Sequence, residues 1–512
     1  MDSQGVNPMN TTIGIYTLDD IQERTLNSIR DAMRRGKRRV LVVAPTGCGK
    51  TVLSLAIAKL AAEKNTQVDF VVSGKPLVAQ TEKKAQKADL EHSVWIAGHD
   101  DPFNHFSPFR IISKDTLESR REGSRWTPGK IIIVDEVDIS LSEIWQKLQS
   151  EYEYVVGLTG TPCDGRGLGL GTHFDEMVVA AHYSDLIKSG RLVDVPESCC
   201  FSPYRPDLDG AKLGADGDFQ KTWLSSRMDK DKLVGDVVHY WTKLAQERPT
   251  LVCCVDKKHT VHVCEAFNKE GINAEYVIDD TQEKERQEIF KRVERGETRV
   301  IVNCATLTRG FDLPCISCLV LAKPTKRLRT YLQMVGRVLR SCPGKTDAIV
   351  IDHSGSVWRH GWPTEDRDWT LDATVSTEEL REKSSKPKQE VERFCPECAC
   401  LMKFSQVCPN CGYKKPVRSQ QAETVDGKLV NVKKSQVKKK NPEKNEFQQL
   451  WMMCLAVMAN CGKTYAQSAS MFHGKTGQWP EQAGVGPTCK FHERQMKVAA
   501  LWPNFIRRKK GA

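Results

Sequence analysis

The 512-residue sequence has no apolar run of about 18 residues, the length that a membrane-spanning helix needs. Its first residues, Met1 to Thr17, are mostly polar and lack the apolar segment of a secretion signal. The chain has 19 cysteines, but its length and the missing signal argue against a disulfide framework. We therefore expect a soluble, intracellular protein of about three domains.

Acidic residues are too few to balance the basic ones. The chain has 76 Lys and Arg against 65 Asp and Glu, which gives a net charge of +11. Such an excess favours a polyanionic partner such as nucleic acid, although solvated surface lysines produce the same balance.

A glycine-rich loop follows a short apolar strand near the N-terminus. Residues 44–51 read Ala-Pro-Thr-Gly-Cys-Gly-Lys-Thr, with Ala44 where the usual pattern has glycine. In such a loop consecutive backbone N–H groups turn inward and cradle phosphate oxygens. The lysine reaches the β- and γ-phosphates, and the threonine hydroxyl holds Mg²⁺. The residues expected to bind a nucleotide here are Thr46, Gly47, Cys48, Gly49, Lys50 and Thr51.

Short apolar runs alternate with helical stretches in two separate blocks. The first block has expected strands at 40–43, 68–72, 131–134 and 155–158. The second has them at 251–255, 274–278, 299–303, 318–321 and 348–351, with helices at 258–269 and 283–295. This alternation predicts two βαβ domains, each with its own parallel sheet. We interpret the Pro-, Asp- and Gly-rich stretch at 201–217 as the region of the connection.

Acidic residues end one strand of the first block. Asp135 and Glu136 follow the apolar run at 131–134, which delivers them to the carboxyl edge of the sheet beside the glycine loop. We expect Asp135 to hold Mg²⁺, and Glu136 to position and polarise an attacking water. The next strand ends in Thr159-Gly160-Thr161, whose small hydroxyl residues are placed to link the nucleotide site to a second ligand.

The second block ends in a basic helix. Gln333, Arg337 and Arg340 are spaced four and three residues apart, which predicts that they share one helix face. Arginines on a separate domain suit a mobile phosphate clamp. An arginine supplied across a cleft raises the rate of phosphoryl transfer by about 10³–10⁵. A solvated basic face is the alternative. The catalytic candidates are Lys50, Asp135, Glu136, Arg337 and Arg340, and Gln333 is a candidate nucleotide contact.

The order of these motifs over residues 12 to 365 resembles that of superfamily 2 helicases and translocases. The resemblance implies two RecA-like domains, and Asp135–Asp138 is similar to the DEAD/DEAH box, with Asp138 in place of His. It places Gln22 at the family's adenine contact, and it implies that Gly310 and Asp312 touch the nucleotide. The residues that it implies for nucleic-acid contact are Lys75, Thr116 and Thr308.

One subfamily resembles the chain more closely. Residues 333–347 and 352–355 look like RadD-type DNA repair helicases, and residues 166–169 and 186–193 fit the same group. This resemblance implies a bacterial protein or a phage relative that acts on single-stranded or branched DNA. It also implies the cytoplasm of the bacterium or of the phage host, no membrane partner, and single-strand-binding or recombination proteins as candidate partners.

Two cysteine pairs follow the second block. Cys395-x₂-Cys398 and Cys408-x₂-Cys411 can place four thiolates around one Zn²⁺ in a closed tetrahedral site. Such a site indicates a structural zinc ribbon, and RadD-like proteins also carry a cysteine quartet after the motor. Free thiols or an iron–sulfur cluster are the alternatives. The lysine-rich stretch at 417–445 is interpreted as a flexible basic linker, either a solubilising tether or a phosphate contact.

These observations together predict an α/β protein. We expect RecA-like domains at 1–200 and 201–370, a zinc ribbon at 390–416, a basic linker at 417–445 and a small helical module at 446–512. The expected function is that of an ATP-dependent DNA helicase or translocase that uses ATP, Mg²⁺ and Zn²⁺. One alternative is a non-unwinding translocase or restriction-type motor subunit, although the sequence shows no nuclease constellation. The other is a non-enzymatic DNA-binding adaptor, against which the intact set of Lys50, Glu136 and the arginines argues.

Overall fold

The computed structural model describes residues 11–99, 101–121, 124, 126–202, 208, 211–214, 217–245, 248–304, 313–377, 381, 393–394, 401–402 and 430–431. The chain divides into a unit of residues 1–438 and a second unit of residues 439–512, and all described residues belong to the first. The expected C-terminal module therefore lies outside the described residues. Among the helices of the described ranges, none has the length and apolar character needed to cross a bilayer.

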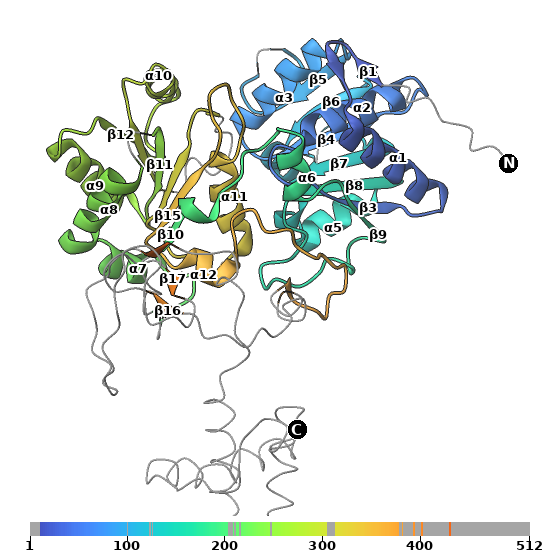
Figure 1. The fold of residues 1–512 in the computed structure, drawn as a ribbon. Coiled ribbons are helices and arrows are strands. Elements are labelled where there is room, and N and C mark those ends of the chain that lie inside the picture. Colours follow the sequence, from blue (N-terminus) through green and yellow to red (C-terminus); the bar gives the residue numbers. More distant parts are fainter. Residues whose placement is uncertain are drawn as a thin grey trace, which may run out of the picture. The chain divides into compact units, whose positions relative to one another are not determined.

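Seven parallel strands form the sheet of the first block, in the order β5-β6-β4-β7-β8-β3-β9 (Figure 1). The strands are β3 (Arg39–Val43), β4 (Val68–Val72), β5 (His92–Trp95), β6 (Phe109–Ser113), β7 (Ile131–Asp135), β8 (Tyr154–Thr159) and β9 (Glu176–Val179). The four expected strands are confirmed to within one residue at each end. The structure adds β5, β6 and β9, which the apolar runs did not reveal.

Helices cover both faces of this sheet. They are α1 (Asp20–Arg34), α2 (Lys50–Ala62), α3 (Lys75–Lys87), α4 (Lys114–Arg120), α5 (Glu143–Ser150) and α6 (Tyr183–Lys188). Side chains along each strand alternate between two hydrophobic clusters: Val40 and Val42 belong to one, and Leu41 to the other. Because both faces are buried, the strands appear in the sequence as continuous apolar runs. A small hairpin, β1 (Thr12–Ile13) and β2 (Tyr16–Thr17), precedes α1.

The second block repeats the plan, with the strand order β12-β13-β11-β14-β15-β10-β18. Its strands are β10 (Cys200–Ser202), β11 (Thr250–Cys253), β12 (Ala274–Val277), β13 (Val300–Asn303), β14 (Cys318–Leu321), β15 (Ile349–Asp352) and β18 (Val430–Asn431). Its helices are α7 (Lys221–Met228), α8 (Asp231–Leu244), α9 (Lys257–Lys269), α10 (Glu283–Glu294), α11 (Leu328–Val338) and α12 (Ser356–His360). All pairs are parallel except β10–β18. Since β18 falls within the expected basic linker, those two linker residues belong to the sheet.

The connection between the blocks differs from the sequence interpretation. The chain leaves α6 and passes to the second block through residues 189–195, which we call the crossover segment. Phe201 already lies in β10, where it pairs with Ile351 of β15. The stretch at 201–217 is therefore not the connection, because it begins in the first strand of the second block.

After α12 the chain returns to the first block as residues 362–377, which we call the strap (orange in Figure 1). The strap pairs with the loop that follows β8: Thr377 N–H donates to the carbonyl of Gly167 at 2.9 Å, and Gly171 N–H to that of Leu371 at 2.6 Å. Gly169 has no room for a side chain, since an ideal Cβ would lie 2.6 Å from two strap carbonyl oxygens. The two blocks are thus joined by two crossings of the chain.

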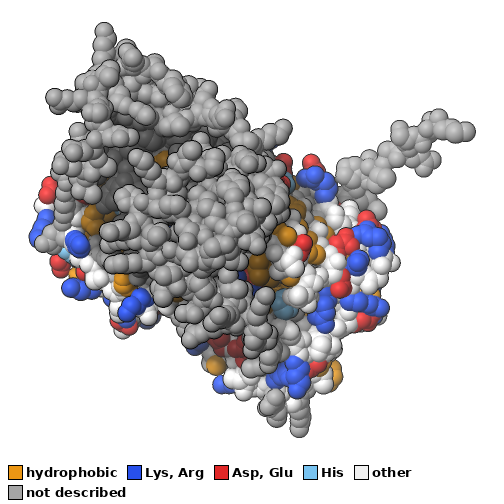
Figure 2. Space-filling model, turned by 90° about the horizontal axis from the view of Figure 1, so that it is seen from below, with side chains coloured by type: hydrophobic (Ala, Val, Ile, Leu, Met, Phe, Trp, Pro, Cys, Tyr) orange, Lys and Arg blue, Asp and Glu red, His pale blue; other side chains and the backbone are white. Residues whose placement is uncertain are grey.

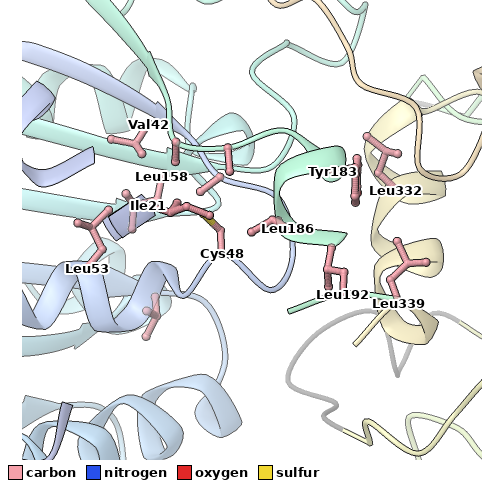
Figure 3. Close-up of a cluster of buried hydrophobic side chains, with 14 of the residues drawn as sticks. Ile21, Val42, Cys48, Leu53, Leu158, Tyr183, Leu186, Leu192, Leu332 and Leu339 are labelled. Atoms are coloured by element: carbon pink, nitrogen blue, oxygen red, sulfur yellow. The ribbon is translucent and has the colours of Figure 1, made fainter. Parts of the chain in front are cut away.

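A continuous hydrophobic cluster joins the blocks. It runs from Cys48 of the first block through Leu186 of α6 and Leu192 of the crossover segment to Leu332 and Leu339 at α11 (Figure 3). This core holds the nucleotide loop and α11 against the same short segment.

Two further strands, β16 (Arg393–Phe394) and β17 (Leu401–Met402), form an antiparallel pair on either side of Cys395 and Cys398. All four expected zinc ligands lie outside the described residues. On the face seen in Figure 2, the visible Lys and Arg side chains alternate with Asp and Glu and do not gather in one basic patch. The positive net charge therefore does not mark a binding surface on the visible part of this face.

Candidate nucleotide site

The glycine loop between β3 and α2 has the backbone that phosphate binding needs. Gly47 and Gly49 have φ angles of +88° and +79°, a left-handed conformation that glycine adopts at little cost. Gly49 stands directly before Lys50, the first residue of α2, so the loop ends at the helix N-terminus. The Lys50 ammonium donates to the Ala44 carbonyl at 3.1 Å. The loop is therefore closed over its own lysine.

Three segments touch this loop. The Gln22 amide of α1 lies against Gly49, and Leu192 of the crossover segment lies against Gly47, each leaving no space for a Cβ. Gly336 of α11 packs on Thr46, since an ideal Cβ would lie 2.6 Å from the Thr46 hydroxyl oxygen. The loop is thus contacted by its own block, by the crossover segment and by the second block.

Cys48 of the loop is buried. Burial raises the pKa of its thiol to about 11, so the thiol is protonated near neutral pH. Cys48 therefore contributes packing and backbone to the loop and is no nucleophile.

The acidic pair Asp135–Glu136 lies at the end of β7, and β8 separates β7 from β3 in the sheet. Glu136 has a left-handed backbone, with φ at +52°, which is uncommon for a residue with a Cβ. Its Oε1 is 4.0 Å from the Lys50 ammonium. The acids and the nucleotide loop therefore meet at the carboxyl edge of the sheet, as the sequence predicts.

Asp135 fits a magnesium ligand. Burial, followed by the charge of Glu136, raises the pKa of Asp135 to about 6, and its Oδ1 is buried without a hydrogen-bond partner. A divalent cation would satisfy that oxygen and lower the pKa of the carboxyl. The described residues contain no group of three or more His, Cys, Asp or Glu that could hold a metal. Mg²⁺ needs no such group, because it binds through one or two carboxylates together with substrate phosphates and water.

Helix α11 of the second block supplies the opposite side of the site. Arg329 donates to Oε2 of Glu136 at 2.6 Å, and Gln333 donates to the same oxygen at 3.1 Å. Arg329 also pairs with Asp138, with 2.7 Å between Nε and Oδ2. The sequence interpretation missed Arg329. A signal was present, because residues 329, 333 and 337 follow a spacing of four that places them on one helix face.

These contacts set opposite pKa shifts on neighbouring acids. Burial alone would raise the pKa of Glu136, but Lys50 and Arg329 outweigh it and hold the pKa below its usual value. Burial raises the pKa of Asp138 to about 6 in spite of Arg329. The Thr159 hydroxyl donates to Asp138 at 2.7 Å, so the small hydroxyl residue at the end of β8 connects to the acidic motif.

The two predicted arginines of this region have different positions. Arg337 lies on α11, and its charge contributes to the low pKa of Glu136. Helix α11 ends at Val338, so Arg340 lies two residues beyond it, and the prediction that Arg340 shares the helix face is wrong. The helix ends where the chain pairs with the crossover segment. Val193 N–H donates to the Leu339 carbonyl at 2.8 Å, and Leu192 forms an isolated antiparallel β-bridge with Arg340.

The residues expected to contact nucleic acid are placed unequally. Lys75 is exposed at the start of α3, whereas Thr116 of α4 is only 4 % exposed, so its side chain is not presented to a ligand in this conformation. Thr308, Gly310 and Asp312 lie outside the described residues. Thr51 stands in the first turn of α2, next to Lys50.

Comparison with known families agrees with this geometry. Residues 15–164 match the model described as the type III restriction enzyme res subunit, and residues 229–342 match that of the helicase conserved C-terminal domain. The two matches cover the two blocks in the helicase order. The chain belongs to superfamily 2 of the helicases. Members of this superfamily hydrolyse ATP with Mg²⁺.

Relatives of this superfamily 2 chain include proteins of fungi, viruses and bacteria. It is 30 % identical over 352 residues to the putative mitochondrial ATP-dependent helicase irc3 of Schizosaccharomyces pombe. The aligned region covers 66 % of this chain and 57 % of that protein. It is 27 % identical over 421 residues to a 51.5 kDa protein of a Lactococcus phage. That aligned region covers 80 % of this chain and 85 % of the phage protein. The chain thus spans little more than half the length of the fungal relative.

Among solved structures, the fold is similar to a fragment of a putative HsdR subunit of a type I restriction enzyme from Vibrio vulnificus. The TM-score is 0.52 at 16 % identity, and the match covers 68 % of this chain and 66 % of that one. At this identity the likeness supports the arrangement of two RecA-like domains and nothing beyond the fold.

Proposed function

We propose that this chain is an ATP-dependent motor that hydrolyses ATP between its two RecA-like blocks and moves on DNA, which it unwinds during replication, recombination or repair. One observation carries the proposal. Glu136 of the first block is approached by Lys50 of the same block and is hydrogen-bonded by Arg329 and Gln333 of the second. A site with walls on two blocks can couple a chemical step to a change in their separation.

The residues divide the chemistry among them. The loop N–H groups and Lys50 bind the phosphates, and Arg337 stabilises charge on the group in transfer. Asp135 and Thr51 would hold Mg²⁺, which neutralises phosphate charge when bound. Lys50 lowers the pKa of Glu136. A phosphate that draws Lys50 away therefore raises the basicity of Glu136, as a group that polarises water requires.

Nucleic acid is the proposed track. The superfamily assignment and the helicase names of the relatives support this choice, and Lys75 is an exposed cation next to the carboxyl end of β4. The RadD-type likeness of residues 333–347 favours DNA over RNA and a role in repair or recombination. Gly310, Asp312 and Thr308 are proposed as nucleotide and strand contacts on their motif likeness alone, and Arg340 stays a candidate phosphate contact.

The first test is whether nucleic acid stimulates the ATPase. We expect single-stranded DNA to raise ATP turnover at least several-fold, because strand binding would favour the closed arrangement of α11 over Glu136. Turnover is measured with no nucleic acid, with single- and double-stranded DNA and with RNA. Equal rates under all four conditions would contradict a translocating motor.

Strand displacement on forked, tailed and DNA–RNA hybrid substrates then separates a helicase from its alternatives. Stimulated ATPase without strand separation would favour a non-unwinding translocase or a restriction-type motor. DNA binding without any ATP turnover would favour the adaptor.

We also propose that Cys395, Cys398, Cys408 and Cys411 bind one Zn²⁺ per chain in the ribbon at 390–416. Metal binding would hold this short segment together, because it has few apolar residues of its own. Cys398→Ser or Cys408→Ser is expected to release the metal and to leave the basal ATPase unchanged. Elemental analysis measures the zinc, and Cys400→Ser is the matched control, since Cys400 lies outside the paired spacing. Full zinc content in both ligand variants would contradict the assignment.

A further inference from the structure

The crossover segment holds an arginine against the nucleotide loop. We propose that Arg191 covers the base of the bound nucleotide together with Gln22, and thereby makes base recognition part of the contact between the blocks. This inference rests on the proposed function, because it assigns a specificity residue to the same nucleotide site.

The contacts of Arg191 place it at the side of the loop. Its guanidinium donates to the Cys48 carbonyl at 3.3 Å and forms an ion pair with Asp19. Asp19 is the N-cap of α1: its Oδ1 accepts from Ile21 N–H at 2.9 Å and from Gln22 N–H at 3.0 Å. The carboxylate that fixes Arg191 therefore also fixes the turn that carries Gln22.

Gln22 and Arg191 have the chemistry of a base site and not of a phosphate site. A glutamine amide carries an NH2 donor group and a carbonyl acceptor, which can pair with the edge of a purine. The carbonyl oxygen of Gln22 also accepts from Asp19 N–H at 3.2 Å, which fixes the orientation of the amide. A guanidinium is planar and stacks on aromatic rings, which a lysine ammonium cannot do in the same way. The phosphate contacts are already supplied by Lys50 and the loop N–H groups, and the end of the site where water would attack lies at Glu136. These contacts leave the ribose and the base unassigned, and of the two only the base offers an aromatic face on which a guanidinium can stack.

The crossover segment also reaches the second block just beyond Arg337. The Ser341 hydroxyl donates to the Arg191 carbonyl at 3.1 Å, and Val193 N–H donates to the Leu339 carbonyl at 2.8 Å. The Leu192 side chain lies among the buried side chains between Cys48 and Leu339 (Figure 3). A base that engages Arg191 therefore acts on a segment bonded directly to the end of α11.

The experiment compares the binding of ADP with that of inorganic tripolyphosphate, which has no base. Isothermal titration calorimetry is performed on the full chain and on the variants Arg191→Ala and Arg191→Lys. We expect Arg191→Ala to weaken ADP binding about 10-fold, which corresponds to a desolvated cation–π contact, and to change tripolyphosphate binding less than about 2-fold. Lys188→Ala is the matched control, because Lys188 is an exposed cation three residues away, at the end of α6.

Steady-state kinetics give an independent readout. Arg191→Ala should raise KM for ATP about 10-fold, leave kcat within about 3-fold and reduce the preference for ATP over pyrimidine triphosphates. Arg191→Lys keeps a positive charge for Asp19 without the planar group, so it should fold like the parent and still lose ADP affinity. It serves as the test where the alanine variant does not fold.

The outcomes are distinct. Equal weakening of ADP and tripolyphosphate would overturn the inference and indicate a phosphate-side or structural role. Unchanged ADP binding in both variants, or full affinity in Arg191→Lys, would overturn it as well. A parent chain that binds neither ligand would overturn the proposed function itself, and the inference with it.

Discussion

Replacing Glu136 by Gln should abolish ATP turnover and leave ATP binding intact. The amide has the size of the carboxylate and still offers Arg329 and Gln333 an oxygen acceptor, but it has no basic oxygen to polarise water. General-base contributions of this kind amount to about 10²–10⁴ in rate, so we expect a loss of at least 100-fold. The measurement is steady-state ATPase activity with saturating DNA, together with calorimetric ATP binding.

Two further variants serve as a comparison and a control for this prediction. Lys50→Ala should weaken nucleotide binding and turnover together, because Lys50 contacts the phosphates in the ground state as well. Glu63→Gln makes the same chemical change at an exposed residue directly after α2 and should leave both quantities unchanged. Near-parental hydrolysis by Glu136→Gln would remove Glu136 from the role proposed for it.

Replacing Arg337 by Ala should lower ATP turnover by about 10³-fold while DNA affinity is retained. Arg337 shares a helix face with Arg329 and Gln333, which contact Glu136, and its charge already acts on that carboxylate. Its contribution is expected only when charge develops on the transferred phosphoryl group. The measurement is ATPase activity at saturating DNA and the fluorescence anisotropy of a labelled single strand.

The control is Arg295→Ala, since Arg295 is an exposed residue whose ion pair with Glu297 is worth little. It should change neither turnover nor DNA affinity. A variant at Arg337 that kept its ATPase activity, or lost DNA affinity in proportion, would count against an arginine that acts across the site. Arg340→Ala is informative beside it, because the structure places Arg340 beyond the helix.

The sequence predicted what is local. The glycine loop, the acids after β7 and most strands could be predicted because a short run of residues determines each of them. The buried strands β5 and β6 were missed for a physical reason. Their sequences contain polar residues that tertiary contacts satisfy: Arg110 of β6 is fully buried and pairs with Asp69 of β4. In β6, Arg110 leaves only Ile111 and Ile112 as consecutive apolar residues, whereas β4 keeps a longer run at 70–72 beside its own Asp69. An apolar-run criterion therefore finds β4 and rejects β6.

The features that decide the site were less accessible. Arg329 and Glu136 are 193 residues apart. The spacing of residues 329, 333 and 337 places Arg329 on a helix face, but it does not predict which residue Arg329 contacts. Arg340 was placed on the helix because its spacing fits one, but backbone pairing with Val193 and Leu192 ends the helix first. The role of residues 189–195 was hidden for the same reason, since its partners come from both blocks.

The strap has a mechanical consequence. A body fastened at one point can swing in any direction, whereas a body fastened at two neighbouring points turns about the line that joins them, as a door does. The crossover segment and the strap meet where the Thr364 hydroxyl donates to Asp194 at 2.7 Å. The crossover segment and the strap therefore act together as a two-stranded hinge for the second block. Opening would carry Arg329 and Arg337 away from Glu136 along one fixed arc, and each closure would return them to the same place.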